Sequence, residues 1–278
     1  MLKQRVLTAI ALLAGLYAAL TLLDLTAWGW LVAVILGLAG WEWGRLSGLA
    51  PGGAIGSGVI TFLLVAAAAA FAFGPTGVLP DAMRPLSALH ALAIAFWLVV
   101  VPAWMWRGGR PSGFWMALTG LVVLLPPALA LIQLRAQGLV PLLLLMAVVW
   151  IADIAAYFTG RAFGRHKLAP AISPGKTWEG AFGAVIAVQC YGLAIKPLLF
   201  TEADMPAWLV WSVILLLLTA VSIVGDLFES MMKRQAGIKD SSQLLPGHGG
   251  VLDRVDSLTA TLPLIGFALL NLLPGAQT

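Results

Sequence analysis

Residues 139–160 read LVPLLLLMAVVWIADIAAYFTG, and this run settles the class of protein. Asp153 is its single charged side chain. At the 1.5 Å rise of an α-helix, about 20 apolar residues cross the ~30 Å hydrocarbon core of a bilayer. Similar runs recur from end to end of the chain, so the sequence predicts an all-α, polytopic integral membrane protein.

The composition agrees with this class. The chain has 278 residues, 61% hydrophobic and 10% charged, and its mean hydropathy is +0.97. A soluble domain would have too few polar residues to cover its surface. The single cysteine, Cys190, excludes an intramolecular disulfide and a zinc site built from cysteines. The net charge of +4 does not indicate nucleic acid as a partner, because the bases are divided among short loops.

Nine apolar spans are long enough to cross the membrane. The first two are separated by a short stretch around Asp24 and predict a tight helical hairpin, whereas the third is also compatible with a re-entrant segment. We interpret residues 1–278 as one transmembrane domain, with N-terminal helices in 1–135 and a catalytic portion in 139–273. The spans are 6–23, 26–44, 54–73, 86–106, 114–134, 139–160, 180–200, 207–229 and 255–273.

Charge placement predicts the orientation. If the N-terminus is cytosolic and the spans alternate, all but three of the 16 Lys and Arg residues fall in inner segments, Arg110 among them. The exceptions are Arg84, Arg135 and Lys196. Such an asymmetry follows the positive-inside rule, so it supports nine spans, a cytosolic N-terminus and an outer C-terminus.

The last polar stretch, 230–256, reads SMMKRQAGIKDSSQLLPGHGGVLDRVD and concentrates charges of both signs. Just before it, Asp226 shares a helix face with Ser230 and Lys233. Asp226 lies ~10 Å inside the end of its span, where a carboxylate must face a cavity, a base or a metal. Asp253 and Asp256 are spaced i, i+3 and can point back toward it. Three such carboxylates suit Mg²⁺, whereas helix capping is the alternative for Asp253 alone.

A glycine-rich turn precedes the last span. Gly249 and Gly250 allow backbone N–H groups to approach an anion, and the helix N-terminus that follows adds partial positive charge. The alternative is an ordinary turn. His248 could contact phosphate, or it could bond to the loop backbone.

A second polar loop runs from Asp153 to residue 180, DIAAYFTGRAFGRHKLAPAISPGKTWEG. Asp153 lies at a depth similar to that of Asp226, which predicts that both line one cavity. Lys176 could bind phosphate, as could Arg165 and Lys167. The segment 173–177 is similar to the end of a P-loop, but position 170 is proline where that motif needs glycine. Two G-x-x-x-G pairs, 40/44 and 160/164, indicate close helix packing or, as an alternative, a dimer seam.

These residues resemble a known family. Ser230-Met-Met-Lys233-Arg234, Lys239-Asp240, Pro246-Gly-His248-Gly249-Gly250 and Asp253-Arg254-Val-Asp256 are similar to the signature of phosphatidate cytidylyltransferases, also called CDP-diacylglycerol synthases. The upstream segments 173–180, SPGKTWEG, and 41–43, WEW, resemble that family too. The resemblance covers nearly the whole chain.

The resemblance implies a reaction of CTP with phosphatidic acid that gives CDP-diacylglycerol and pyrophosphate with Mg²⁺, a second cation being left open. It also implies a bacterial inner-membrane protein, with its site toward the cytosol and a homodimer left open. Asp226 and Asp253 would be metal ligands supported by Asp256. The catalytic residues would be these three aspartates together with Lys233 and Arg234, whose cationic side chains would hold phosphates. Further phosphate and polar contacts would come from Ser173, Lys176, Ser230, Lys239, His248, Gly249, Gly250 and Arg254.

Two other functions are compatible with parts of the pattern. A CTP-dependent lipid or polyprenol kinase would need similar bases and metal ligands, but the length of the C-terminal match favours the cytidylyltransferase. An ion-coupled transporter could use Asp153 and Asp226. The charges gather at one face, however, and the two polar loops show no repeat symmetry.

Overall fold

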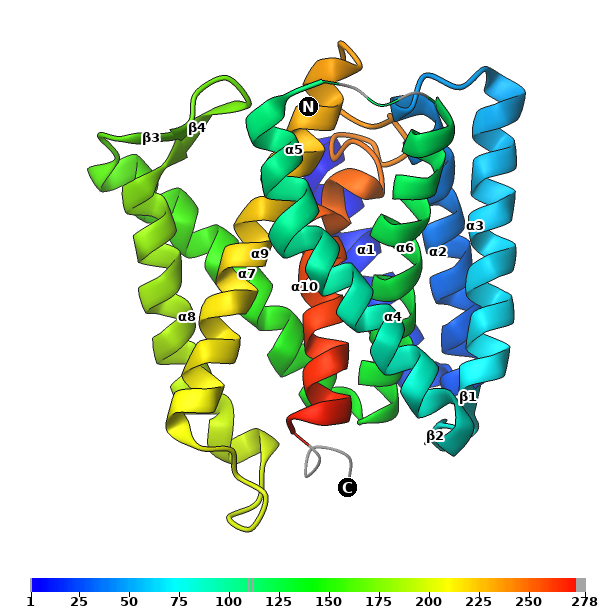
Figure 1. Ribbon diagram of the computed structural model, residues 1–278, viewed down its shortest axis with the longest axis vertical. Coiled ribbons are helices and arrows are strands. Elements are labelled where there is room, and N and C mark those ends of the chain that lie inside the picture. The colour runs from blue at the N-terminus through cyan, green and yellow to red at the C-terminus, as the bar shows by residue number, and fades with distance from the viewer. Residues whose placement is uncertain (1, 110, 112, 274–278) are drawn as a thin grey trace.

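A computed structural model describes residues 2–109, 111 and 113–273 as a bundle of long helices that run between two ends (Figure 1). The predicted all-α architecture is confirmed. The helices are α1 (Leu2–Leu22), α2 (Leu25–Leu46), α3 (Pro51–Ala72), α4 (Met83–Ala95), α5 (Val101–Arg107), α6 (Gly113–Ala136), α7 (Leu139–Phe163), α8 (Trp178–Leu199), α9 (Trp208–Gln235) and α10 (Leu252–Asn271).

Short elements complete the chain. A 3-10 turn, η1 (Pro80–Ala82), and a π-helical stretch, η2 (Phe96–Val100), join α4 and α5 into one apolar rod, Pro80–Arg107. Two antiparallel hairpins stand at opposite ends of the bundle (Figure 1). They are β1 (Phe73–Gly74) with β2 (Gly77–Val78), and β3 (Lys167–Ala169) with β4 (Ser173–Thr177).

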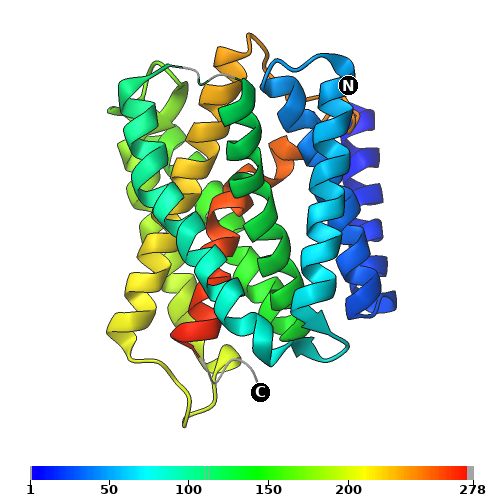
Figure 2. The same ribbon diagram turned by 45° about the vertical axis from the view of Figure 1, so that its right-hand side comes forward.

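Helices occur at all nine predicted places, but seven of them are long and apolar enough by themselves to cross a membrane, counted over the described residues. In α1 the apolar part, Val6–Leu22, is shorter. The other exception, α10, begins with Asp253, Arg254 and Asp256, which interrupt its apolar run. It is nevertheless packed in the middle of the bundle against α4, α6 and α9 (Figure 2).

The third span is a continuous helix and not a re-entrant segment, because α3 packs along the length of α2. The glycines of α2 permit this approach. A Cβ at Gly44 would lie 2.8 Å from the Cα of Ala54, and one at Gly40 would collide with Thr61. Gly160 and Gly164 likewise face Thr177. Both G-x-x-x-G pairs therefore serve close packing inside the chain.

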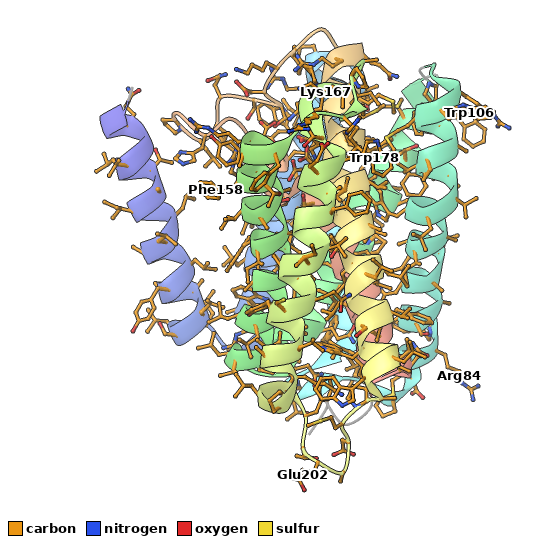
Figure 3. The ribbon with its side chains drawn as sticks, turned by 90° about the vertical axis from the view of Figure 1, so that its left-hand side faces the viewer. Arg84, Trp106, Phe158, Lys167, Trp178 and Glu202 are labelled. Carbon is orange, nitrogen blue, oxygen red and sulfur yellow. The ribbon has the colours of Figure 1, made fainter. Side chains whose placement is uncertain are left out.

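The predicted hairpin of α1 and α2 has a short connection, but its two helices do not pack closely against each other. Asp24 caps α2 directly after α1 ends, yet α1 then stands apart from the other helices (Figure 3). It is held near its two ends. Arg135 donates to the carbonyl of Leu20 at 3.1 Å, and Thr8 donates to the carbonyl of Pro246 at 2.9 Å.

An aromatic cluster fixes α9 against its neighbours. The ring of Phe228 is stacked with Trp43 at a centroid distance of 6.2 Å and meets Phe96, Trp97 and Trp104 edge-on at 5.3–6.2 Å. Such pairs contribute about 0.5–1.5 kcal/mol each beyond the area they bury. The acidic residues of α9 on either side of Phe228 are thus held by a rigid core.

The loops sort into two ends, as the charge pattern predicted. One end carries the β3–β4 hairpin and the 236–251 loop, and we call it the basic end (Figure 1). Lys167 lies there, whereas Arg84 and Glu202 lie at the opposite end (Figure 3). Arg110 and residues 274–278 lie outside the described residues, as do the side chains of Lys3 and Arg5. The proposed division into portions 1–135 and 139–273 stays a prediction.

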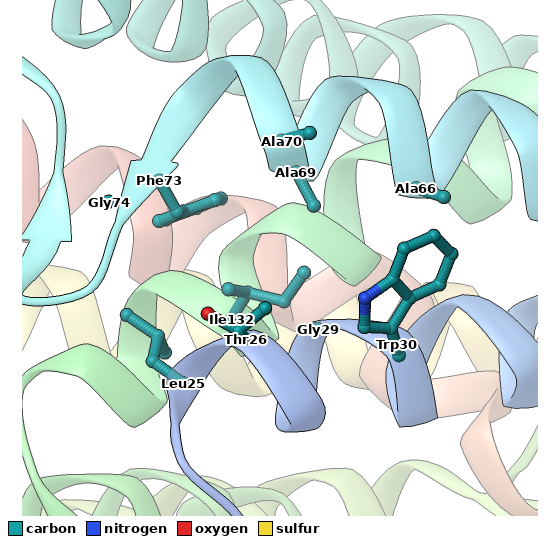
Figure 4. Close-up of a pocket in the computed structure, with 10 residues that line it drawn as sticks. All are labelled: Leu25, Thr26, Gly29, Trp30, Ala66, Ala69, Ala70, Phe73, Gly74 and Ile132. Carbon is teal, nitrogen blue, oxygen red and sulfur yellow. The ribbon is translucent and has the colours of Figure 1, made fainter.

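A small cavity of about 190 Å³ lies near β1, between α2, α3 and α6 (Figure 4). Its lining includes Trp30, Phe73 and Ile132 and contains no charged side chain. An apolar pocket of this kind cannot compensate the charge of a phosphate. The chemistry must therefore be sought elsewhere in the bundle.

Candidate active site

A cavity of about 730 Å³ gathers most of the charged residues that the sequence singled out. Its walls come from α7, the β3–β4 hairpin, α8, α9 and the first turns of α10. Asp153 and Asp226 both line it, as their similar depth predicted. The charged and hydroxyl side chains in its lining are Asp153, Tyr157, Arg161, Ser173, Lys176, Thr177, Asp226, Asp253, Arg254 and Asp256.

The β3–β4 hairpin carries a cation into this cavity. Strand β4 pairs with β3 through Lys167–Thr177 and Ala169–Ser173, and Thr177 then caps α8 by accepting from the amide of Gly180 at 3.2 Å. The ammonium of Lys176 lies 2.5 Å from a carboxylate oxygen of Asp226. Segment 173–177 is thus a strand that presents a lysine to α9, and not a phosphate-binding loop of the P-loop kind.

Local bonds fix the base of the hairpin. Glu179, in the first turn of α8, accepts from the backbone amide of His166 at 3.2 Å, and its carboxylate lies 2.6 Å from the ring nitrogen Nδ1. Below this point Gly160 and Gly180 let α7 and α8 approach each other closely. The lysine is therefore held on a supported turn at the basic end.

Asp253 is the best-bonded carboxylate of the site. Its Oδ1 lies 2.7 Å from the ammonium of Lys233, which also reaches Glu229 at 2.9 Å. Its Oδ2 accepts from the amide and the hydroxyl of Ser241, both at 2.9 Å, and from the amide of Gly250 at 2.8 Å. Asp253 thus ties the loop to α10, and its position in the first turn of this helix is favourable to the helix dipole, as the alternative expected. It also lines the cavity. Its role as a metal ligand stays a prediction.

Asp153 and Asp256 complete an acidic surface. Each interacts electrostatically with Asp226, and Asp256 accepts from the amide of Ser257 at 2.7 Å. Among the described side chains neither forms a salt bridge. Lys176 and Lys233 pair directly with other carboxylates, and they act on Asp153 and Asp256 only from a longer distance.

Whether these residues suit Mg²⁺ can be judged from their donor atoms. Over the residues that the structure describes, no group of three acidic or histidine side chains converges closely enough to hold an ion. Mg²⁺, however, is usually bound by one or two carboxylates together with substrate phosphates and water, and it prefers oxygen ligands. The oxygen donors of Asp226 and Asp256 fit this requirement.

The glycine-rich turn is built around protein carboxylates. Gly249 has a φ of +82°, and the amide of Gly250 donates to Asp253. The next two amides, those of Val251 and Leu252, donate to Glu42 of α2 at 3.0 and 2.6 Å. In this arrangement these amides are directed into the protein. Phosphate contacts by His248, Gly249 and Gly250 stay a prediction.

The other predicted residues surround the cavity without lining it. Lys233 lies behind Asp253, and the hydroxyl of Ser230 approaches Asp226 at 3.4 Å. Arg234 and Lys239 are exposed at the basic end. Their phosphate contacts also stay predictions.

Three residues near the cavity were not among those predicted for the site: Glu42, Tyr157 and Arg161. Tyr157 accepts a bond from Arg161 at 3.1 Å, and both line the cavity. Their spacing from Asp153, i+4 and i+8, places all three on one face of α7 and could have revealed them. Glu42 could have been found because it is an acidic residue inside an apolar span, where a carboxylate needs a partner.

Comparison with known proteins agrees with this geometry. Residues 3–272 match the cytidylyltransferase family. A phosphatidate cytidylyltransferase of Pseudomonas aeruginosa is 40% identical over 279 residues, 95% of each chain. One of Haemophilus influenzae is 35% identical over 96% of this chain and 98% of its own. One of Brucella suis is 50% identical over 163 residues, 58% of this chain and 57% of its own. The chain belongs to the cytidylyltransferase family.

Proposed function

We propose that this protein transfers a cytidylyl group from CTP to phosphatidic acid, with CDP-diacylglycerol and pyrophosphate as products. One observation carries the proposal: four carboxylates and three bases from separate elements line one cavity of about 730 Å³ near the basic end. Two anionic substrates need such a mixture of charges. The similarity to phosphatidate cytidylyltransferases along nearly the whole chain supports the same choice.

The chemistry requires charge compensation more than proton transfer. An oxygen of the phosphatidate phosphate attacks the α-phosphorus of CTP, and the bond from that phosphorus to the β-phosphate oxygen breaks. Pyrophosphate leaves with the bonding electrons. The attacking phosphate is already anionic near neutral pH, since its second pKa is ~6. A general base is therefore unnecessary, and we propose in-line displacement without a covalent enzyme intermediate.

The basic side chains bring the two anions together. Lys176, Arg161 and Arg254 line the cavity from three different elements, and each can contact a phosphate oxygen. Fixed cations of this kind lower the repulsion between the reactants and stabilise the charge on the leaving group. Because Lys176 is paired with Asp226, it is oriented before substrate arrives. Three further bases lie outside the lining of the cavity. Lys233 would act by holding Asp253, and Arg234 and Lys239 would contact the outer phosphates of CTP.

We also propose that the site binds Mg²⁺. Asp226 and Asp256, with Asp253 next to them, would hold the ion through carboxylate oxygens on the side of the cavity where these acids gather. When bound, Mg²⁺ neutralises part of the triphosphate charge. A second cation is left open.

The membrane position follows from where the substrates reside. CTP is dissolved in water, whereas phosphatidic acid keeps its acyl chains in the leaflet. The cavity wall of α7 carries Trp150 and Tyr157, which are 40% and 58% exposed. Aromatic side chains of this type are common at headgroup depth. We place the basic end in the cytosol and the protein in the bacterial inner membrane, with a homodimer left open.

The direct test uses the purified chain in phosphatidate-containing vesicles with CTP and Mg²⁺. The proposal expects CDP-diacylglycerol, identified by mass spectrometry, and an equimolar amount of pyrophosphate. A folded preparation that forms neither product would contradict it.

A further inference from the structure

The geometry points to Glu42 as the positioning residue that holds the first turn of α10, and with it Asp253, in the arrangement that transfer requires. This inference rests on the proposed function. Glu42 belongs to α2, about 200 residues before the loop it contacts, and it does not line the cavity. It acts through Asp253 and not on substrate.

Glu42 is fully buried, and both of its oxygens are saturated with donors. Oε1 accepts from the hydroxyl of Ser242 at 2.5 Å and from the amide of Val251 at 3.0 Å. Oε2 accepts from the amide of Leu252 at 2.6 Å and from the hydroxyl of Ser241 at 3.2 Å. A carboxylate can accept at both oxygens, whereas the NH2 group of a glutamine would face one serine hydroxyl and one backbone N–H, which cannot accept.

The bonded amides belong to a helix N-terminus. The first amides of an α-helix have no partner within the helix, and that end carries partial positive charge. Glu42 supplies both the missing acceptors and the opposite charge. A phosphate is often found at such a position, but in α10 the place is taken by a side chain of the protein itself.

A single hydroxyl connects Glu42 to the cavity. Ser241 Oγ lies 3.2 Å from Glu42 Oε2 and 2.9 Å from Oδ2 of Asp253. Its single proton can be donated to one of these carboxylates at a time, so the hydroxyl lies between the two and links them. One turn further along α2, Arg45 donates to the carbonyl of Ser241 at 3.3 Å. A Cβ at Gly250 would collide with both Ser241 Oγ and Glu42 Oε1. The turn therefore needs glycine here so that Ser241 and Glu42 can approach the backbone.

Through the backbone of α10, Glu42 also affects the positions of two acidic residues of the cavity. Asp253 lies one residue after Leu252, whose amide Glu42 holds, and Asp256 follows one turn later. Loss of the Glu42 carboxylate would free the first turn of α10 and the 236–251 loop together. Residues that orient the ligands of a metal site typically change activity by about 10- to 100-fold when they are removed, and Glu42 would do this for the predicted ligand Asp253.

The experiment compares Glu42→Gln with Gln133→Ala in the purified full-length chain. Gln133 is also fully buried and also bonds to the backbone of α10, at Gly266, but far from Asp253. Two readouts are taken: kcat and KM for CTP and phosphatidate, and the rate at which trypsin cleaves after exposed Lys239 in the loop. A general loss of stability would affect both variants alike.

For Glu42→Gln the inference expects a kcat about 10- to 100-fold lower, KM values changed much less, and several times faster cleavage after Lys239. Gln133→Ala is expected to keep the wild-type kcat and cleavage rate. Equal kcat and equal cleavage rates in Glu42→Gln and wild type would overturn the inference. If the wild type itself makes no CDP-diacylglycerol, the proposed function is wrong, and the cleavage rate alone then decides on Glu42.

A second variant covers the case in which Glu42→Gln fails to fold. Ser241→Ala removes the bridging hydroxyl and leaves the Glu42–amide bonds in place, so the same changes are expected at smaller size. Ser222→Ala is its matched control, because Ser222 is a buried serine whose hydroxyl has no bond among the described residues. If trypsin cleaves the two alanine variants at the same rate and both have the same kcat, the hydroxyl of Ser241 has no positioning role.

Discussion

Lys176 is the residue on which the charge balance of the cavity depends most. Its ammonium pairs with Asp226 at 2.5 Å, and it is the lysine in the cavity lining. We expect Lys176→Met to lower kcat/KM about 10²- to 10³-fold, as removal of one fixed transition-state donor does. The melting temperature should change little, since partly exposed ion pairs contribute about 0–1 kcal/mol. Lys167→Met is the control, because Lys167 is on the same hairpin but does not line the cavity. An equal loss in both variants would contradict the assignment.

Asp253 combines structure and chemistry, so its loss should show in both. In Asp253→Asn an amide group would face the ammonium of Lys233 or the donors of Ser241 and Gly250. Breaking a buried pair costs about 3–5 kcal/mol. We expect activity below detection and a clearly lower melting temperature in detergent. Asp240→Asn, an exposed acid in the same loop, should resemble the wild type. An Asp253→Asn protein as stable as the wild type would argue against the bonding described.

At this scale the sequence predicted some contacts and could not predict others. Helical spacing placed Asp226 near Ser230, and the similar depth of Asp153 and Asp226 placed both in one cavity. The partners of Glu42 could not be predicted, because they lie 199 to 210 residues away and the contact depends on how α2 packs against α10.

Among the elements, α2 and α6 approach each other closely at Gly120. A Cβ at Gly120 would collide with the indole of Trp43, whose Nε1 donates to the carbonyl of Met116 at 2.7 Å. We expect Gly120→Ala to lower the stability by about 1–3 kcal/mol, the usual cost of overpacking. Thermal unfolding in detergent measures it. Gly15→Ala on α1, where nothing lies within 4 Å, should leave the melting temperature unchanged or slightly higher. The reverse order would contradict the packing.

The long helices could be predicted because apolar length is a strong local pattern, whereas the β3–β4 hairpin could not. Its strands have three and five residues, and β4 contains Pro174 and Gly175, which favour turns. It is defined by its pairing and by its attachment to α8 through Thr177 and Glu179. The separation of α1 from the other helices could not be predicted either, since a short connection does not determine whether two helices pack together.

For the whole molecule, the proposed orientation can be tested by cysteine labelling. The single cysteine, Cys190, is exposed and is first replaced by serine. Lys167→Cys and Glu202→Cys then mark the two ends (Figure 3). In intact bacterial cells we expect a membrane-impermeant maleimide to label Glu202→Cys. We expect it to label Lys167→Cys only after the cells are lysed, because basic loops stay in the cytosol. The opposite pattern would place the site on the outer face.

The central claim is that the cavity between α7, α9 and α10 transfers the cytidylyl group to phosphatidic acid. It is tested most directly by supplying the purified chain with phosphatidic acid, Mg²⁺ and CTP labelled at either the α- or the γ-phosphate, with Lys176→Met alongside. We predict that the lipid gains the α-label, that the γ-label leaves in pyrophosphate, and that Lys176→Met does both far more slowly. Transfer of the γ-label to lipid would make the protein a kinase, and no transfer of either label by a folded preparation would contradict the account altogether.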